Sequence, residues 1–169
     1  MTETACILED APAGPCTDGS GLEDPGDVVV SPDGNDVYVT GIASSTVVHL
    51  ARDAATGSLA QRECFEDADE GGLVQEDGEP VARCANAPAI SFPTGLAITP
   101  DGRDLLMVGA YSGALSRYGR DPSTGALSFG GCIQDDDEEG GPLRVAACGA
   151  GRALMGAKAV TVSPDGRNA

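Results

Sequence analysis

The sequence contains no tryptophan, and its three tyrosines and three phenylalanines make up only 4% of the 169 residues. A core must therefore be built mainly from valine, leucine, isoleucine and alanine. No stretch approaches the roughly 20 apolar residues that a membrane-spanning helix needs. Because 41% of the residues are nevertheless hydrophobic, the composition indicates a folded chain rather than a disordered one.

Motifs of known chemistry are also missing. The sequence has no Gly-x-Ser-x-Gly nucleophile elbow, no His-Glu-x-x-His pair and no phosphate-binding Gly-x-x-x-x-Gly-Lys loop. It has no Cys-x-x-Cys pair that would suit a metal ion. Motifs therefore identify no catalytic residue, and we expect no cofactor.

Positive charge is scarce, with ten Lys and Arg residues against 27 Asp and Glu residues and a net charge of −17. The phosphate backbone of a nucleic acid and the surface of an anionic membrane would both be repelled by this charge. We expect neither of them as a partner, which leaves an unknown protein or small-molecule ligand.

Six cysteines without metal-binding spacing indicate disulfides and hence an oxidising compartment, although buried free thiols are the alternative. We expect a secreted, periplasmic or cell-surface protein. Residues 1–16 are acidic and lack the apolar core of a signal peptide. We therefore expect that an export signal has been removed or lies on a longer parent chain.

An internal repeat organises the chain. The turn Ser31-Pro32-Asp33-Gly34 returns as Thr99-Pro100-Asp101-Gly102 and again as Ser163-Pro164-Asp165-Gly166. The segment from Arg52 to Leu59 (RDAATGSL) returns as Arg120 to Leu127 (RDPSTGAL), with the same offset that separates the first two turns. Two motifs that share one offset identify a true repeat.

The cysteines follow the same register. The spacing from Cys16 to Cys64 equals that from Cys84 to Cys132, whereas the spacing between the remaining neighbours varies. A scaffold of fixed length thus alternates with a variable loop that two cysteines flank. Six cysteines allow 15 pairings, of which one treats every repeat alike. It joins Cys6 to Cys16, Cys64 to Cys84 and Cys132 to Cys148.

Each scaffold unit is predicted to contain four antiparallel strands, which is typical of a β-propeller blade. The first unit has them at 27–30, 37–40, 46–50 and 58–62. The second has them at 95–99, 104–109, 114–118 and 126–129, and the third begins with a strand at 159–163. The predicted organisation is a disulfide loop at 1–16, a blade at 17–64, a loop at 65–84, a blade at 85–132, a loop at 133–148 and the start of a third blade at 149–169.

The segments from Val28 to Thr40 and from Arg52 to Leu59, with the second copy of the latter, resemble the lactonase-like seven-bladed β-propellers that carry YVTN repeats. The resemblance covers nearly everything outside the inter-cysteine loops. It implies an all-β fold with a closed ring of about seven blades, of which this chain holds an incomplete part. Either the chain is a fragment, or several copies associate to complete a ring. The resemblance also raises sugar-lactone hydrolysis, as in 6-phosphogluconolactonase-like propellers, as an activity.

Few residues qualify for chemistry. His49 is the one histidine, and its place on a predicted strand favours a packed or surface residue. Calcium prefers oxygen ligands, so the acidic run Asp135, Asp136 and Asp137 is a weak candidate site, although it lacks the order of a calcium loop.

Repeated residues are better explained by structure. We interpret the carboxylates of Asp33, Asp101 and Asp165 as groups that stabilise their own turns, because a catalytic site would break the repeat. The spacing of Gly149, Gly151 and Gly156 does not fit a dinucleotide-binding loop, so we expect turn residues there. The sequence thus favours a binding or scaffold module, with a lactone hydrolase as the alternative and an adhesive or surface-layer array as a third possibility.

Overall fold

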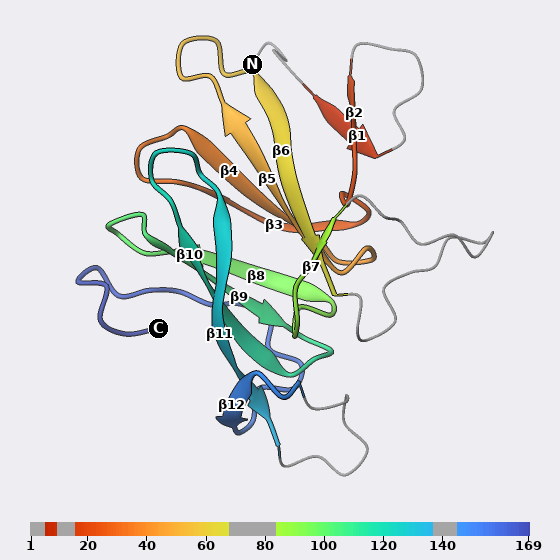
Figure 1. Cartoon of the computed structure of the whole chain (residues 1–169), viewed down its shortest axis with the longest axis vertical. Helices are drawn as coiled ribbons and strands as arrows, with labels where there is room; N and C mark the ends of the chain where they lie inside the picture. Colours follow the sequence, from red (N-terminus) through yellow and green to blue (C-terminus); the bar gives the residue numbers. More distant parts are fainter. Residues whose placement is uncertain (1–5, 10–15, 68–83, 137–144) are drawn as a thin grey trace, which may run out of the picture.

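The computed structural model describes residues 6–9, 16–67, 84–136 and 145–169. These residues form strands and turns without helices, which confirms the predicted all-β class (Figure 1). No described helix could therefore cross a membrane.

Two five-stranded sheets correspond to the two repeat units. The first sheet consists of β3 (Pro25–Val30), β4 (Asp36–Gly41), β5 (Thr46–Arg52), β6 (Leu59–Glu66) and β7 (Ala85–Asn86). The second consists of β8 (Pro93–Ile98), β9 (Asp104–Gly109), β10 (Ala114–Arg120), β11 (Leu127–Asp135) and β12 (Cys148–Gly151). In each sheet the first four strands are antiparallel neighbours in chain order, as in a propeller blade.

The first connection of each blade is the repeated turn. The amide of Gly34 donates to the carbonyl of Ser31 at 2.8 Å, and Gly102 and Gly166 make the same bond to Thr99 and Ser163. These three glycines have φ of +76°, +70° and +71°, which explains why glycine ends the turn in every copy.

Short parallel strands at the disulfides were not predicted. The outer strands β6 and β11 run on through Cys64 and Cys132, and each pairs in parallel with β7 or β12 beyond the loop. A third small sheet pairs β1 (Ile7–Glu9) with β2 (Thr17–Gly19) in the same way.

The structure contains the disulfides Cys6–Cys16, Cys64–Cys84 and Cys132–Cys148, the pairing that the spacing predicted. Cys132 and Cys148 are direct neighbours across two parallel strands, with their Cα atoms 4.5 Å apart. This closeness corrects the expectation for Gly149 and Gly151, which lie in β12 rather than in a turn, because the disulfide brings their backbone beside β11.

The predicted strand at 159–163 is also wrong, since these residues form no strand. A strand needs a hydrogen-bonded neighbour, and none of the described residues pairs with this segment as β4 pairs with β3. The segment nevertheless lies along the second blade, where Thr94 Oγ1 donates to the carbonyl of Ala157 at 2.8 Å.

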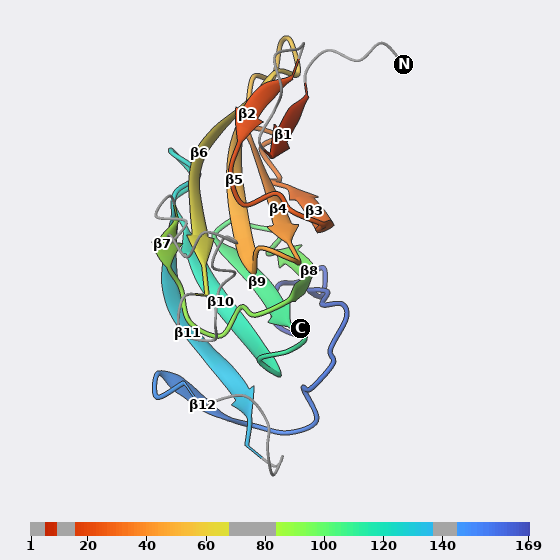
Figure 2. The ribbon, with the colours of Figure 1, turned by 90° about the vertical axis from the view of Figure 1, so that its right-hand side faces the viewer.

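The main core lies between the two blades. Tyr38 and Val47 of the first blade pack against Leu105, Met107 and Tyr118 of the second. A smaller cluster on the opposite face of the first blade is partly covered by residues of β1 and the segment that follows β2. Figure 2 shows the two sheets from the side, with β1 and β2 at one end of the molecule and β12 at the other.

Removal of one disulfide should destabilise the fold. A Cys64→Ser/Cys84→Ser double variant frees a loop with a sequence separation of 20 residues. We expect its free energy of unfolding to fall by about 3 kcal/mol, because the unfolded chain gains conformational entropy. Urea denaturation measures this loss, and an unchanged midpoint would contradict it.

Peptide mapping without reduction, with the unsubstituted chain as control, should yield three bridged peptides, each with two cysteines from one loop.

Candidate functional site

Polar side chains of the first blade gather on the face of β4 and β5 that is turned toward the second blade. Alternation along β4 places Asp36 and Tyr38 on this face, and the strand register sets Tyr38 opposite His49. The rings of Tyr38 and His49 stack with their centroids 5.1 Å apart. All three side chains are buried, so one face presents a carboxylate, a phenol and an imidazole to the neighbouring blade.

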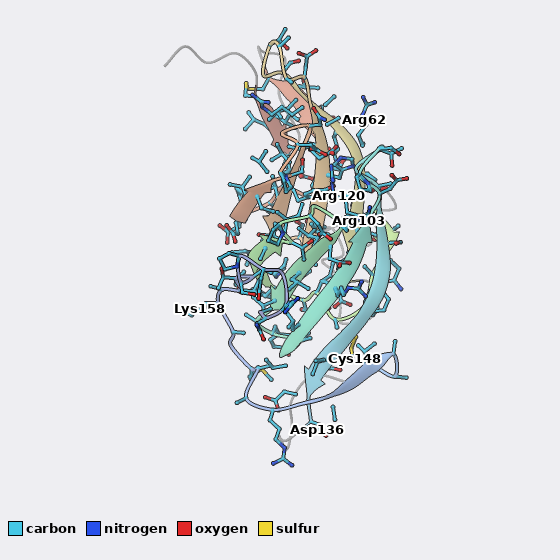
Figure 3. All side chains as sticks on the ribbon, turned by 90° about the vertical axis from the view of Figure 1, so that its left-hand side faces the viewer. Arg62, Arg103, Arg120, Asp136, Cys148 and Lys158 are labelled. Carbon is cyan, nitrogen blue, oxygen red and sulfur yellow. A yellow bond between two sulfur atoms is a disulfide. The ribbon has the colours of Figure 1, made fainter. Side chains whose placement is uncertain are left out.

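Arg120, the last residue of β10, meets this group from the second blade (Figure 3). Its Nε donates to Tyr38 Oη at 2.9 Å, and its Nη1 donates to the carbonyl of Gly102 at 3.0 Å. Its Nη2 donates to the carboxylates of Asp33, at 3.0 Å, and of Asp36. A guanidinium suits this place because it presents several donors in one plane. Arg120 therefore joins the two blades.

The charge of Arg120 is almost completely removed from water, since the residue is only 5% exposed. Burial opposes the charged form, but hydrogen bonds to Asp36, Asp33 and Tyr38 outweigh it and raise the pKa of Arg120. Burial also raises the pKa of Tyr38 to about 12. The phenol thus stays neutral and can donate its own proton at physiological pH.

The loop after β10 packs against Asp36, Tyr38 and His49. Tyr38 Oη donates to the carbonyl of Gly125 at 2.6 Å. Gly125 has φ of +75°, and a Cβ on it would collide with the side chains of Asp36 and His49. Glycine is therefore required here for its conformation and for space.

His49 is a packing residue rather than an accessible catalytic base. Its Nε2 lies 2.7 Å from Asp36 Oδ1 and donates to it, because an ionised carboxylate can only accept. Its Nδ1 has no hydrogen-bond partner among the described residues and lies 3.7 Å from Glu63 Oε1. A ring that water cannot reach is closed to a substrate as well, which agrees with the interpretation of His49 as a packed strand residue.

The sequence did not reveal that Asp36, Tyr38 and Arg120 form one group. The sequence does contain one indication that this arginine matters. Arg52 and Arg120 end the third strand of the two repeats, directly before an Asp-x-x-Thr-Gly turn. The repetition indicated a structural role for this arginine. Its partners could not be inferred, since Arg120 and Asp33 are 87 residues apart in the chain.

The repeated turn carboxylates Asp33, Asp101 and Asp165 have the structural role that the repeat indicated. Each accepts a hydrogen bond from the hydroxyl two residues earlier, at 2.5, 2.6 and 2.6 Å. These bonds are the largest cause of the lowered pKa of each carboxyl. Asp33 differs from the other two because it also binds Arg120.

A second repeated feature uses the acidic residue three positions after the first cysteine of each pair, namely Glu9, Asp67 and Asp135. Each carboxylate accepts a hydrogen bond from a main-chain amide that lies at a constant distance in sequence beyond the second cysteine. The three bonds come from Leu22, Ile90 and Leu154 and measure 2.6, 2.8 and 2.8 Å. The carboxylate and the disulfide together therefore hold the base of each variable loop.

The weak calcium candidates do not come together in the described structure. The carboxylate of Asp135 accepts hydrogen bonds from backbone amides. Asp136 is exposed at the same end of the molecule as Cys148 (Figure 3). Asp137 lies outside the described residues. Within the described ranges no three His, Cys, Asp or Glu side chains are grouped so that they could hold a metal ion.

One exposed feature breaks the repeat. Phe92 and Tyr111 are 48% and 57% exposed, with ring centroids 6.0 Å apart, whereas the first blade has Asp24 and Ala43 at these positions. The amide of Phe92 donates to Ser45 Oγ at 3.3 Å. The aromatic pair therefore lies near the residues at which the strands β5 and β10 begin.

Known proteins resemble this chain in structure but not closely in sequence. A candidate 6-phosphogluconolactonase from Bacteroides uniformis superimposes on 89% of the chain with a TM-score of 0.55 and 16% identity. A second one, from Bacteroides fragilis, covers 76% with a TM-score of 0.49 and 20% identity. The periplasmic gluconolactonase of Pseudomonas aeruginosa covers 72% with a TM-score of 0.31 and 20% identity.

The chain spans 33%, 29% and 41% of the length of these three proteins, respectively. No protein-family model and no curated protein matches the sequence. At these identities the likeness shows the fold alone.

Replacement of the arginine at the blade junction should be far more costly than replacement of its repeat counterpart. Arg120→Gln leaves the buried carboxylate of Asp36 without its cation, and we expect a loss of about 3–5 kcal/mol in the free energy of unfolding. Arg52→Gln is the matched control, with an expected loss below about 1 kcal/mol, because the structure gives Arg52 no ion pair with a described residue. Equal losses in denaturant titrations of the two variants would refute a special role for Arg120.

The junction should also weaken in acid. Hydrogen bonds from Ser31 and Asn35 and the guanidinium of Arg120 lower the pKa of Asp33 from 3.8 to about 2 in the folded chain. The folded state therefore releases this proton more readily than the unfolded state. The stabilising effect of the ionised Asp33 carboxylate is complete above about pH 4 and is lost as the pH falls toward 2. Asp33→Asn should reduce the acid dependence of the unfolding midpoint in this window. Asp165→Asn serves as the control, because the Asp165 carboxylate accepts from the Arg167 amide but binds no guanidinium among the described residues.

Proposed function

The chain has the fold of part of a lactonase-like β-propeller, and from this premise we propose that it is an extracytoplasmic propeller segment that binds a partner and does not catalyse a reaction. The partner is a protein or a small-molecule ligand. The three disulfides support a secreted or periplasmic location, because such bonds persist in oxidising compartments.

The observation that carries this proposal is that the buried polar groups between the two blades bind one another and the backbone. Asp36, His49, Tyr38 and Arg120 bind one another and the backbone, and all of them are closed to solvent. A general base or an electrophile must reach its substrate within hydrogen-bond distance. These groups therefore serve the cohesion of the fold.

Binding is supported by the features that differ between the repeats. The disulfide loops vary in length over a constant base, as expected for segments that carry specificity on a rigid scaffold. Phe92 and Tyr111 expose two neighbouring rings near the residues at which β5 and β10 begin. Exposed aromatic side chains are enriched in binding surfaces, because they bury a large area at a small entropic cost.

A test for lactone hydrolysis distinguishes the proposal from its alternative. The full chain is incubated with a panel of sugar lactones, including 6-phosphogluconolactone and gluconolactone, and acid release is followed in a pH-stat. We expect no rate above that of the reduced and unfolded chain, which serves as the control for contaminants. Saturable turnover that disappears on unfolding would overturn the proposal and favour a lactone hydrolase.

A further inference from the structure

Phe92 has a backbone conformation that is unusual for an aromatic residue. It is the eighth residue after the second cysteine of its pair, and the same position holds Asp24 in the first repeat and Gly156 in the third. All three backbones are left-handed, with φ of +51° at Asp24 and Phe92 and +71° at Gly156. Glycine adopts this conformation freely and aspartate tolerates it, but it is unfavourable for a bulky residue. The fold requires a left-handed residue here and gives no reason for a phenylalanine.

The core does not account for the Phe92 ring either. The ring is about half exposed and meets the exposed ring of Tyr111 at an interplanar angle of 47°. Tyr38 and Tyr118, by contrast, are completely buried in the core between the blades. An exposed ring that is held in an unfavourable backbone conformation indicates a role outside the core.

Hydrogen bonds fix the backbone of this aromatic pair. The amide of Phe92 donates to Ser45 Oγ at 3.3 Å, and its carbonyl accepts from the amide of Ala110 at 2.9 Å. The amide of Tyr111 donates to the carbonyl of Ser91 at 3.3 Å. The two residues are therefore positioned before a ligand arrives, so that binding orders little of the chain and loses little entropy.

Two carboxylates lie across the turn 42–45 from the rings. Glu23 and Asp24 are exposed, and their backbone carbonyls accept hydrogen bonds from the first two amides of the turn, at 3.3 and 2.9 Å. Ser45, the last residue of the turn, binds the amide of Phe92. Neither carboxylate forms an ion pair with a described residue. One turn thus connects an acidic pair, Glu23 and Asp24, to the aromatic pair.

The charge of the chain indicates the sign of the ligand. With a net charge of −17, the protein attracts cations and repels anions. A cation also binds favourably to the face of an aromatic ring, and most strongly when it is an arginine. The rings and the charge therefore favour the same class of ligand.

We propose that Phe92 and Tyr111 bind an arginine side chain from an extended segment of a partner protein, while Glu23 and Asp24 bind a second basic side chain of that segment. A planar guanidinium stacks on a ring and pairs with a carboxylate, whereas an ammonium group is more strongly hydrated and has no flat face. Because a turn separates the rings from the carboxylates, an extended segment fits both better than one small cation. This inference rests on the binding role proposed above and specifies the chemistry of the partner.

A titration with a defined peptide tests the preference for arginine. The full chain, with its disulfides intact, is titrated calorimetrically at physiological ionic strength with a capped peptide of alternating arginine and glycine. The control peptide carries citrulline in place of each arginine, which keeps the shape and removes the charge. We expect saturable binding of the arginine peptide and binding of the citrulline peptide that is weaker by roughly tenfold or more.

The repeat supplies a variant that separates the rings from the charge. Phe92→Asp with Tyr111→Ala places the residues of the first repeat at both positions, removes both rings and adds a negative charge. We expect this variant to bind the arginine peptide roughly tenfold more weakly. Attraction by charge alone would leave binding unchanged or tighten it, and that result would overturn the proposal. Glu23→Gln with Asp24→Asn keeps the rings and should also weaken binding, with a smaller dependence on salt.

Thermal unfolding tests whether the Phe92 ring serves the fold instead. Phe92→Gly relieves the left-handed conformation, so the unfolding midpoint should not fall and should rise by up to about 4 °C. A lower midpoint would show that the fold needs the ring and would overturn the inference.

The binding role itself is tested separately. Equal binding of the citrulline and arginine peptides, or binding of neither, overturns the arginine partner but leaves the binding role in place. Turnover of a lactone overturns the binding role, whichever peptide binds.

Discussion

The buried guanidinium of Arg120 is the interaction on which the arrangement of the two blades depends. A single cation in the core is unfavourable, and here four acceptors surround it, two from turns and two from β4. Lysine could supply the charge but not the planar set of donors that reaches Tyr38, Gly102 and two carboxylates at once. The apolar contacts between the blades are less directional than these hydrogen bonds. The hydrogen bonds of Arg120 therefore define the position of β10 relative to β4.

The variable loops are compatible with this rigid junction because their bases are built separately. A disulfide brings two parallel strands together, and a carboxylate three positions after the first cysteine binds an amide beyond the second. The same pair of bonds occurs in all three copies, although the intervening loops differ in length. The scaffold therefore does not depend on the loop sequence, which leaves the loops free to carry recognition.

Differences between the copies are more informative about function than their similarities. His49 packs beneath Asp36 in the first blade, whereas the equivalent Arg117 of the second blade is exposed and pairs with Asp104 at 2.8 Å. Phe92 and Tyr111 take the places of Asp24 and Ala43. The first difference concerns how each blade meets its neighbour, and the second creates the aromatic surface that the repeat does not require.

The sequence by itself determined the blade repeat, the disulfide pairing and the positions of most strands, because these depend on local spacing, turn residues and alternation. Ala159–Ser163 shows the limit of such reasoning, since a strand pattern forms a strand only where a neighbour is present to bond with. Gly149 and Gly151 became part of β12 because a disulfide, not a local preference, places them beside β11. The meeting of Arg120 with Asp33, Asp36 and Tyr38 was decided only by the tertiary structure, because the packing of one blade against the next joins positions that are distant in the chain.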